Sequence, residues 1–165
     1  MKRQLLHTSQ GVRDIYGMEC ARKLALQDRL HRKLAAYGYH DIETPTFEFF
    51  DVFGSDIGTI PSRELFKFFD RDGNTLVLRP DFTPSVVRAA AKFYMEEPGP
   101  IRMCYQGSAF INNLNYQGRL KETTHRGAEL LGDGSADADA EMIALIVELM
   151  LESGLREFQV SVGQV

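Results

Sequence analysis

Residues 100–132 read PIRMCYQGSAFINNLNYQGRLKETTHRGAELLG, and this stretch decides the fold that we predict for the chain. In its first arm, Ile101 to Phe110, apolar and polar residues alternate, as expected of a strand with one buried face. The second arm, Thr123 to Leu131, ends in two leucines before Gly132. Asparagine and glycine are frequent between the arms, and both favour turns over strands. The stretch therefore predicts an antiparallel hairpin with a long connecting turn.

The hairpin has two interpretations. Polar side chains along one face could hold a small ligand, and the turn could contact a larger partner. An ordinary hairpin in a solvated antiparallel sheet would show the same pattern, and by shape alone it is the commoner structure.

The rest of the chain alternates between helical and extended patterns. Apolar residues at helical spacing predict helices over Glu19–Tyr37, Pro84–Glu97 and Asp137–Ser153. Short strands are predicted over Tyr39–Glu43, Leu65–Phe69 and Thr75–Arg79, and the alternation of Phe158, Val160 and Val162 predicts another. Four phenylalanines between Phe47 and Phe53 indicate core or subunit interface. These elements predict an α+β fold in which helices flank a mostly antiparallel sheet.

The composition limits the classes of function. The 165 residues suffice for one domain, or for part of a larger one, and carry 19 Lys plus Arg against 23 Asp plus Glu. The lack of a basic excess or a basic run argues against nucleic acid as the main partner. Two distant cysteines and four histidines show no metal-ligand spacing, and no stretch is apolar enough for a membrane span. We expect a reduced, cytoplasmic protein without a metal or cofactor.

The hairpin resembles motif 2 of class II aminoacyl-tRNA synthetases of the histidyl type. The matching residues are Phe110, Gly118, Arg119, Gly127 and Glu129. Where that motif places an arginine, a glutamate and a second arginine, this chain has Ile111, Asn113 and Leu114. The first of those arginines holds the α-phosphate of ATP in the synthetases, and isoleucine has no donor for a phosphate. The resemblance therefore implies a kept scaffold with a lost nucleotide site.

A second match lies in LRPDFT, residues 78–83, which resembles the LRPExT segment of the histidyl family. There the acid and the threonine hold the α-amino group of bound histidine, so the resemblance implies that role for Asp81 and Thr83. The alternative makes Asp81 a turn residue and Thr83 the N-cap of the next helix, with Pro84 at its first position.

Three hairpin residues complete the histidine-like pocket that the resemblance implies: Arg119, His125 and Glu129. His125 replaces a glutamine that contacts the amino acid in the synthetases, and an imidazole is rigid and sensitive to pH where an amide is not. For Glu129, a solvent-facing position on the strand remains the alternative.

The segment YGYHDIETPTFE, residues 37–48, resembles motif 1, which forms the dimer interface of class II synthetases. The resemblance implies that Pro45 contributes to a dimer. A proline that simply ends an edge strand is the alternative.

With the nucleotide grip gone, the chain as a whole resembles the histidyl-tRNA synthetase paralogues that act as regulatory subunits of ATP phosphoribosyltransferase in histidine biosynthesis. The resemblance implies no catalytic residues, a catalytic phosphoribosyltransferase partner, self-association as a dimer, and histidine feedback, with free histidine as a candidate ligand. We expect residues 1–165 to be one class II synthetase-like domain, the N-terminal part of a longer chain. Two alternatives remain: a fragment of a histidyl-tRNA synthetase with a degenerate motif 2, and a free-standing amino-acid-binding or dimerisation module.

Overall fold

The computed structural model describes residues 6–54, 60–113 and 118–163, which form two small sheets and three α-helices. The larger sheet has the order β1-β5-β6, with bounds His40–Asp41, Ile101–Phe110 and Glu122–Leu131. The smaller sheet has the order β2-β4-β3, with bounds Phe47–Phe49, Thr75–Leu78 and Lys67–Phe69. The helices are α1 (Gly17–Ala36), α2 (Thr83–Phe93) and α3 (Ala136–Glu152). The α+β prediction is confirmed.

The long hairpin predicted from residues 100–132 is present as β5 and β6. The two strands pair antiparallel from Ile101 opposite Leu131 to Phe110 opposite Glu122. β1 adds to the other edge of β5 in parallel. Because side chains alternate across a sheet, Met103, Tyr105 and Gly107 share one face of β5 and Cys104 lies on the other.

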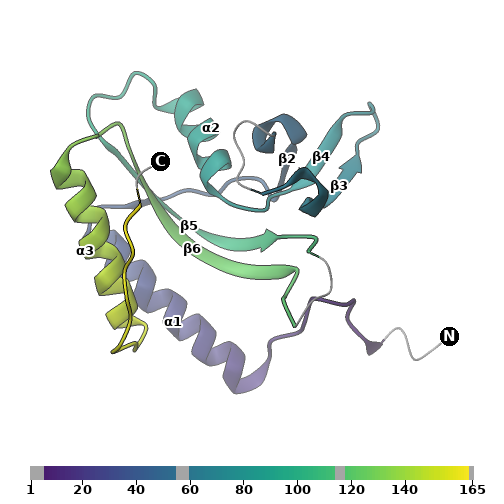
Figure 1. The fold of residues 1–165 in the computed structure, drawn as a ribbon, viewed down its shortest axis with the longest axis horizontal. Coiled ribbons are helices and arrows are strands. Elements are labelled where there is room, and N and C mark those ends of the chain that lie inside the picture. Colours follow the sequence, from purple (N-terminus) through teal and green to yellow (C-terminus); the bar gives the residue numbers. More distant parts are fainter. Residues whose placement is uncertain (1–5, 55–59, 114–117, 164–165) are drawn as a thin grey trace.

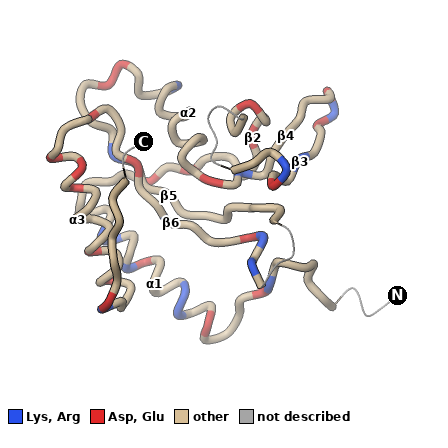
Figure 2. Tube along the Cα trace, in the orientation of Figure 1, with Lys and Arg blue, Asp and Glu red and all other residues tan. Residues whose placement is uncertain are grey.

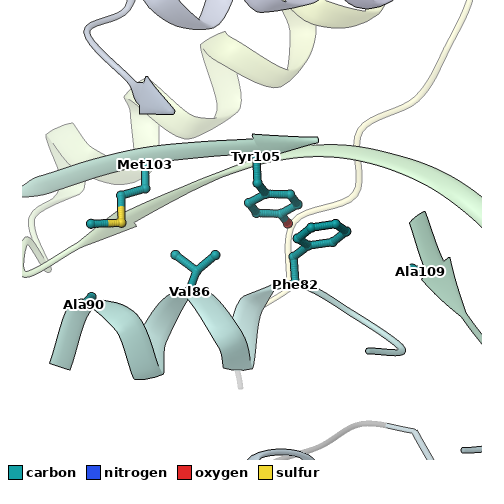
Figure 3. Packing of buried hydrophobic residues seen from close by; sticks show 6 residues of the cluster. All are labelled: Phe82, Val86, Ala90, Met103, Tyr105 and Ala109. Carbon is teal, nitrogen blue, oxygen red and sulfur yellow. The ribbon is translucent and has the colours of Figure 1, made fainter. Parts of the chain in front are cut away.

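Helices cover both faces of the β5–β6 hairpin, with α2 on one side and the neighbouring α1 and α3 on the other (Figure 1). On the α2 side, Met103 and Tyr105 of β5 point at Val86 and Ala90 of α2 and at Phe82 (Figure 3). Val86 is fully buried, and Phe82 is 1% exposed. This apolar layer fixes α2, and with it the LRPDFT segment, against the hairpin.

The layer on the opposite face is also apolar at its centre and is tied at its edges by ion pairs. Leu34 of α1, Cys104 of β5 and Leu145 of α3 are buried together. Arg102 of β5 donates to both carboxylate oxygens of Glu141 on α3, at 2.8 and 2.6 Å. Such a two-point contact fixes orientation as well as distance.

The smaller sheet has one packed face and one apolar face that is partly exposed. On the packed side, Val77 is fully buried against Phe53 and Leu65. On the same side, Arg88 of α2 donates to Glu48 at 2.7 Å.

Cross-strand pairing places five apolar residues on the other side, here called the aromatic face: Phe47, Phe49, Phe68, Leu76 and Leu78. Phe47 and Phe49 are 51% and 55% exposed. The phenylalanine cluster is thus divided between core and surface: Phe53 is buried, whereas Phe47 and Phe49 are exposed.

Two predicted elements differ most from the structure, while the ends of most others shift by one or two residues. The helix predicted over Pro84–Glu97 ends at Phe93. The strand predicted around Phe158–Val162 is wrong, because residues 158–163 pair with no strand among the described residues. Alternation shows only that one face of a segment could be buried, whereas a strand also needs a neighbour for its backbone groups.

The surface shows no single dominant charge. Lys, Arg, Asp and Glu are spread over several elements (Figure 2). Among the described residues, no helix combines the length and the apolar character needed to cross a membrane. The same residues contain no group of three or more His, Cys, Asp or Glu side chains placed to hold a metal ion.

Candidate functional site

Glu129 of β6 is the centre of a polar cluster on the α2 side of the hairpin. Its Oε1 accepts a hydrogen bond from the hydroxyl of Thr83 at 2.6 Å and another from the hydroxyl of Tyr105 at 3.3 Å. Thr83 comes from the start of α2 and Tyr105 from β5. Three elements distant in sequence therefore converge on one carboxylate.

The electrostatics of this cluster favour a positive ligand. Burial raises the pKa of the Glu129 carboxyl, and the nearby Asp81 carboxylate raises this pKa further, while the hydrogen bonds from Thr83 and Tyr105 oppose the rise. Burial is also the main cause of the raised pKa of Tyr105. Within the described ranges, neither Glu129 nor Asp81 forms an ion pair with Lys or Arg. Two carboxylates without a protein cation suit an ammonium group.

The structure corrects the alternative role of Thr83 as an N-cap. α2 begins at Thr83 itself, the preceding Phe82 occupies the cap position, and no side chain caps the helix. The Thr83 hydroxyl instead donates to Glu129. An N-cap side chain accepts from a backbone N–H, whereas here the Thr83 hydroxyl is the donor, so this contact is not a cap. Asp81 Oδ1 accepts from the backbone N–H of the next residue, Phe82, at 2.7 Å, and no hydrogen-bonded turn is assigned at Asp81.

Two other predicted pocket residues lie farther from this centre. His125 stands opposite Gly107 on the α2 side, its Nε2 is 3.0 Å from the Thr123 hydroxyl, and its ring centroid is 6.4 Å from that of Phe82. Arg119 is exposed and forms no hydrogen bond or ion pair with any described residue. Asp81, Thr83, His125 and Glu129 therefore share one side of the sheet, and Arg119 lies outside this group.

The three residues that replace the nucleotide-binding side chains of motif 2, namely Ile111, Asn113 and Leu114, follow β5 in the sequence. The backbone N–H of Ile111 donates to the carbonyl of Lys121 at 2.9 Å, which continues the hairpin by one more pair. The neighbouring Asn112 accepts from the Lys121 ammonium at 3.2 Å. Asn113 is half-buried, and Leu114 lies outside the described residues. The Ile111 side chain has no atom that can donate to a phosphate.

Sequence reasoning did not assign a role in this site to three residues that shape it. Tyr105 was assigned only to the apolar face of its strand, yet it reaches Glu129. Gly127, opposite Tyr105, leaves the room for that ring, since a Cβ at Gly127 would lie 2.4 Å from the Tyr105 hydroxyl oxygen. Arg79 precedes the acid by two residues and is 7% exposed. A glycine inside a strand was the available signal for the close approach.

Comparisons with known proteins identify the family. The family model described as histidyl-tRNA synthetase matches residues 11–165. The chain belongs to the histidyl-tRNA synthetase family. Within that family, it resembles an ATP phosphoribosyltransferase regulatory subunit of Ruminiclostridium cellulolyticum, with 43% identity over 165 residues, which is 100% of this chain and 39% of the relative.

Solved structures of the histidyl-tRNA synthetase family share the fold. A crystal structure described as an ATP phosphoribosyltransferase regulatory subunit/histidyl-tRNA synthetase from Bacillus halodurans matches with a TM-score of 0.84 and 35% identity, over 93% of this chain and 39% of that one. The apo histidyl-tRNA synthetase of S. aureus matches with a TM-score of 0.73 and 26% identity, over 88% of this chain and 34% of that one. This chain therefore spans about two fifths of the length of the relatives that it matches.

Proposed function

We propose that this chain is the N-terminal part of a regulatory subunit of ATP phosphoribosyltransferase, and that it has no synthetase activity. Position 111 carries the proposal. The synthetases hold the α-phosphate of ATP with an arginine there, and Ile111 has no donor for it. Loss of one positioned donor typically lowers a rate by about 10²–10³. Two relatives that are 43% and 42% identical to this chain are named ATP phosphoribosyltransferase regulatory subunit, which supports the same choice.

Such a subunit would act through the catalytic subunit that it binds. We propose that the full-length protein binds the catalytic ATP phosphoribosyltransferase subunit, supports its activity in histidine biosynthesis and conveys histidine feedback to it. Feedback requires histidine to bind one state of the complex more tightly than the other, because equal affinity for both states would shift nothing.

The ligand site for this feedback is the Glu129 cluster. The unpaired carboxylates of Asp81 and Glu129 would accept the α-ammonium group of histidine, with Thr83 as a neutral partner beside them. His125 would lie nearby on the same side of the sheet. Arg119, exposed and outside the cluster, would need to move inward to take part.

Self-association is the second proposed contact. Pro45 precedes β2, and the aromatic face begins two residues later at Phe47. Half-exposed phenylalanines packed on one sheet face are typical of obligate dimer interfaces, which are more apolar than ordinary surface. We assign Pro45 and the aromatic face to a dimer contact.

The deciding experiment uses the full-length protein that carries this chain. We expect it to co-purify with the short catalytic subunit, to raise that subunit's activity, and to show no histidine-dependent exchange of pyrophosphate into ATP. Measurable exchange together with failure to bind the catalytic subunit would reject the proposal and favour a synthetase. That alternative is kept because the matching family model is itself that of a synthetase.

A further inference from the structure

Arg79 is a buried cation with no acidic partner among the residues that the structure describes. It is 7% exposed, and it forms no ion pair with a carboxylate in the described part of the chain. Burial lowers the pKa of its guanidinium. A buried charge is unfavourable unless polar groups surround it, so the position must offer other acceptors.

The acceptors are backbone carbonyls from two separate segments. Nε donates to the carbonyl of Ser108 on β5 at 2.8 Å, and Nη1 donates to those of Thr44 at 2.8 Å and Pro45 at 3.4 Å. The backbone of Arg79 adds two more links, since its N–H donates to Thr46 and its carbonyl accepts from Phe110. One residue thus ties the Thr44–Thr46 turn to the end of β5.

The same guanidinium lies on an aromatic stack that leads to the candidate ligand site. Its Cζ is 4.0 Å from the centroid of the Phe82 ring. Phe82 stacks on Tyr105 with centroids 4.4 Å apart and planes 7° from parallel, and the Tyr105 hydroxyl reaches Glu129. Both contacts are favourable, the first between a cation and a π face and the second between two rings.

The backbone opposite leaves space for this arrangement. A Cβ at Gly107 would lie 2.6 Å from Nη2 of Arg79 and 3.0 Å from Cζ of Phe82. Phe82 is also the chain neighbour of both Asp81 and Thr83. A displacement of Phe82 that reaches its backbone would therefore also move Asp81 and Thr83, and a displacement of its ring would remove the stack on Tyr105.

We propose that Arg79 is a positioning residue for the Glu129 cluster. Anchored on the Thr44–Pro45 turn and on Ser108, it holds Phe82, and Phe82 holds Thr83 and Tyr105 at hydrogen-bonding distance from Glu129. This role rests on the proposed function for its ligand, histidine, but the arrangement of the side chains can be tested without a ligand.

The test compares Arg79→Lys with Arg102→Lys in the full-length protein. Both substitutions keep the positive charge and remove a planar guanidinium fork from a β5 contact, but Arg102 bonds Glu141 on the opposite face of the sheet. Histidine affinity is measured by calorimetry and thermal stability by calorimetric melting. We expect Arg79→Lys to weaken histidine binding at least tenfold, and Arg102→Lys to change it less than twofold at a similar loss of melting temperature.

Crystal structures of the two variants provide the ligand-independent measurement. In Arg79→Lys, we expect the Phe82 ring to be displaced and the Thr83–Glu129 hydrogen bond to be lost; in Arg102→Lys, both stay in place. An unchanged Phe82 ring and Thr83–Glu129 contact in Arg79→Lys would overturn the positioning role. If the wild type binds no histidine, the proposed ligand site fails, and the crystal structures still decide the role of Arg79.

Discussion

At the scale of single residues, the candidate site depends on the carboxylate of Glu129. The hydrogen bonds from Thr83 and Tyr105 offset only part of the free-energy cost of burying its charge. Folding raises the pKa of Glu129, mainly through burial. The folded state therefore binds more protons than the unfolded state between the two pKa values. The contribution of Glu129 to stability is greatest at low pH and decreases as the pH rises through that window.

Replacing Glu129 by glutamine should remove this dependence. Glutamine is neutral at every pH and keeps an oxygen that can accept the hydrogen bond from Thr83. We expect the stability of Glu129→Gln relative to wild type to increase from pH 4 to pH 7 by at most about 1 kcal/mol, because water still screens the half-buried carboxyl. Melting temperatures across this pH range provide the measurement. A stability difference that does not change with pH would contradict the assignment.

The glycine opposite Tyr105 should tolerate no side chain. A Cβ at position 127 would lie 2.4 Å from the hydroxyl oxygen and 2.5 Å from Cζ of Tyr105, whose ring is held by its stack on Phe82. We expect Gly127→Ala to lower the free energy of unfolding by about 1–3 kcal/mol, the usual range for overpacking. Gly134→Ala is the control, since a Cβ there meets nothing within 4 Å. Equal urea midpoints for the two variants would argue against the close contact.

At the scale of elements, α3 begins with a cap that sequence reasoning did not identify. The hydroxyl of Ser135 accepts from the backbone N–H of Ala138 at 3.2 Å, and Asp137 and Asp139 follow in the first turn. We expect Ser135→Ala to lower the free energy of unfolding by about 1 kcal/mol, because a helix N–H loses its acceptor. Chemical denaturation measures the change. Ser161→Ala, at an exposed position outside any helix or strand, should have no effect, and a similar loss there would remove the cap as the explanation.

The elements that sequence predicted best are those whose signal is local. β5 has the predicted bounds Ile101–Phe110, because period-two alternation and flanking turn residues specify such a strand without reference to the rest of the chain. The turn at Asp70–Asn74 is specified by its own residues in the same way, with Asp70 Oδ1 accepting from the N–H groups of Asp72 and Asn74.

The features that sequence reasoning missed depend on tertiary partners. The family resemblance placed Thr83 and Glu129 in one pocket, but their direct contact, 2.6 Å between hydroxyl and carboxylate, follows from the fold and not from the local sequence. Arg79 carries no local sign of its three carbonyl acceptors, which lie about 30 residues away in either direction. The use of the Glu129 cluster as a histidine pocket stays a prediction, because a family resemblance supplies the roles and geometry supplies only the proximity.

At the scale of the whole molecule, the two sheets have separate tasks in our proposal. The β5–β6 hairpin, which helices cover on both faces (Figure 1), carries the proposed ligand site. The smaller sheet leaves the aromatic face open to solvent, where it can meet a second copy. Arg79 joins the two, because its backbone bonds Thr46, just before β2, and Phe110, at the end of β5.

Self-association through the aromatic face should therefore be separable from folding. Phe49 is 55% exposed, so Phe49→Ser removes little buried area within one chain and should change the unfolding free energy of the monomer by less than about 0.5–1 kcal/mol. In the dimer, the same side chain would be buried, and loss of an aromatic anchor of this kind weakens association at least about tenfold.

Sedimentation of the full-length protein measures the dissociation constant. Phe69→Ser is the matched control, because Phe69 is 73% exposed at the end of β3 and pairs with Thr75 rather than with the residues of the aromatic face. Phe49 lies on the aromatic face and Phe69 does not, so a dimer contact through that face should weaken only in Phe49→Ser. An equal effect of both variants on the dissociation constant would contradict a contact through the aromatic face.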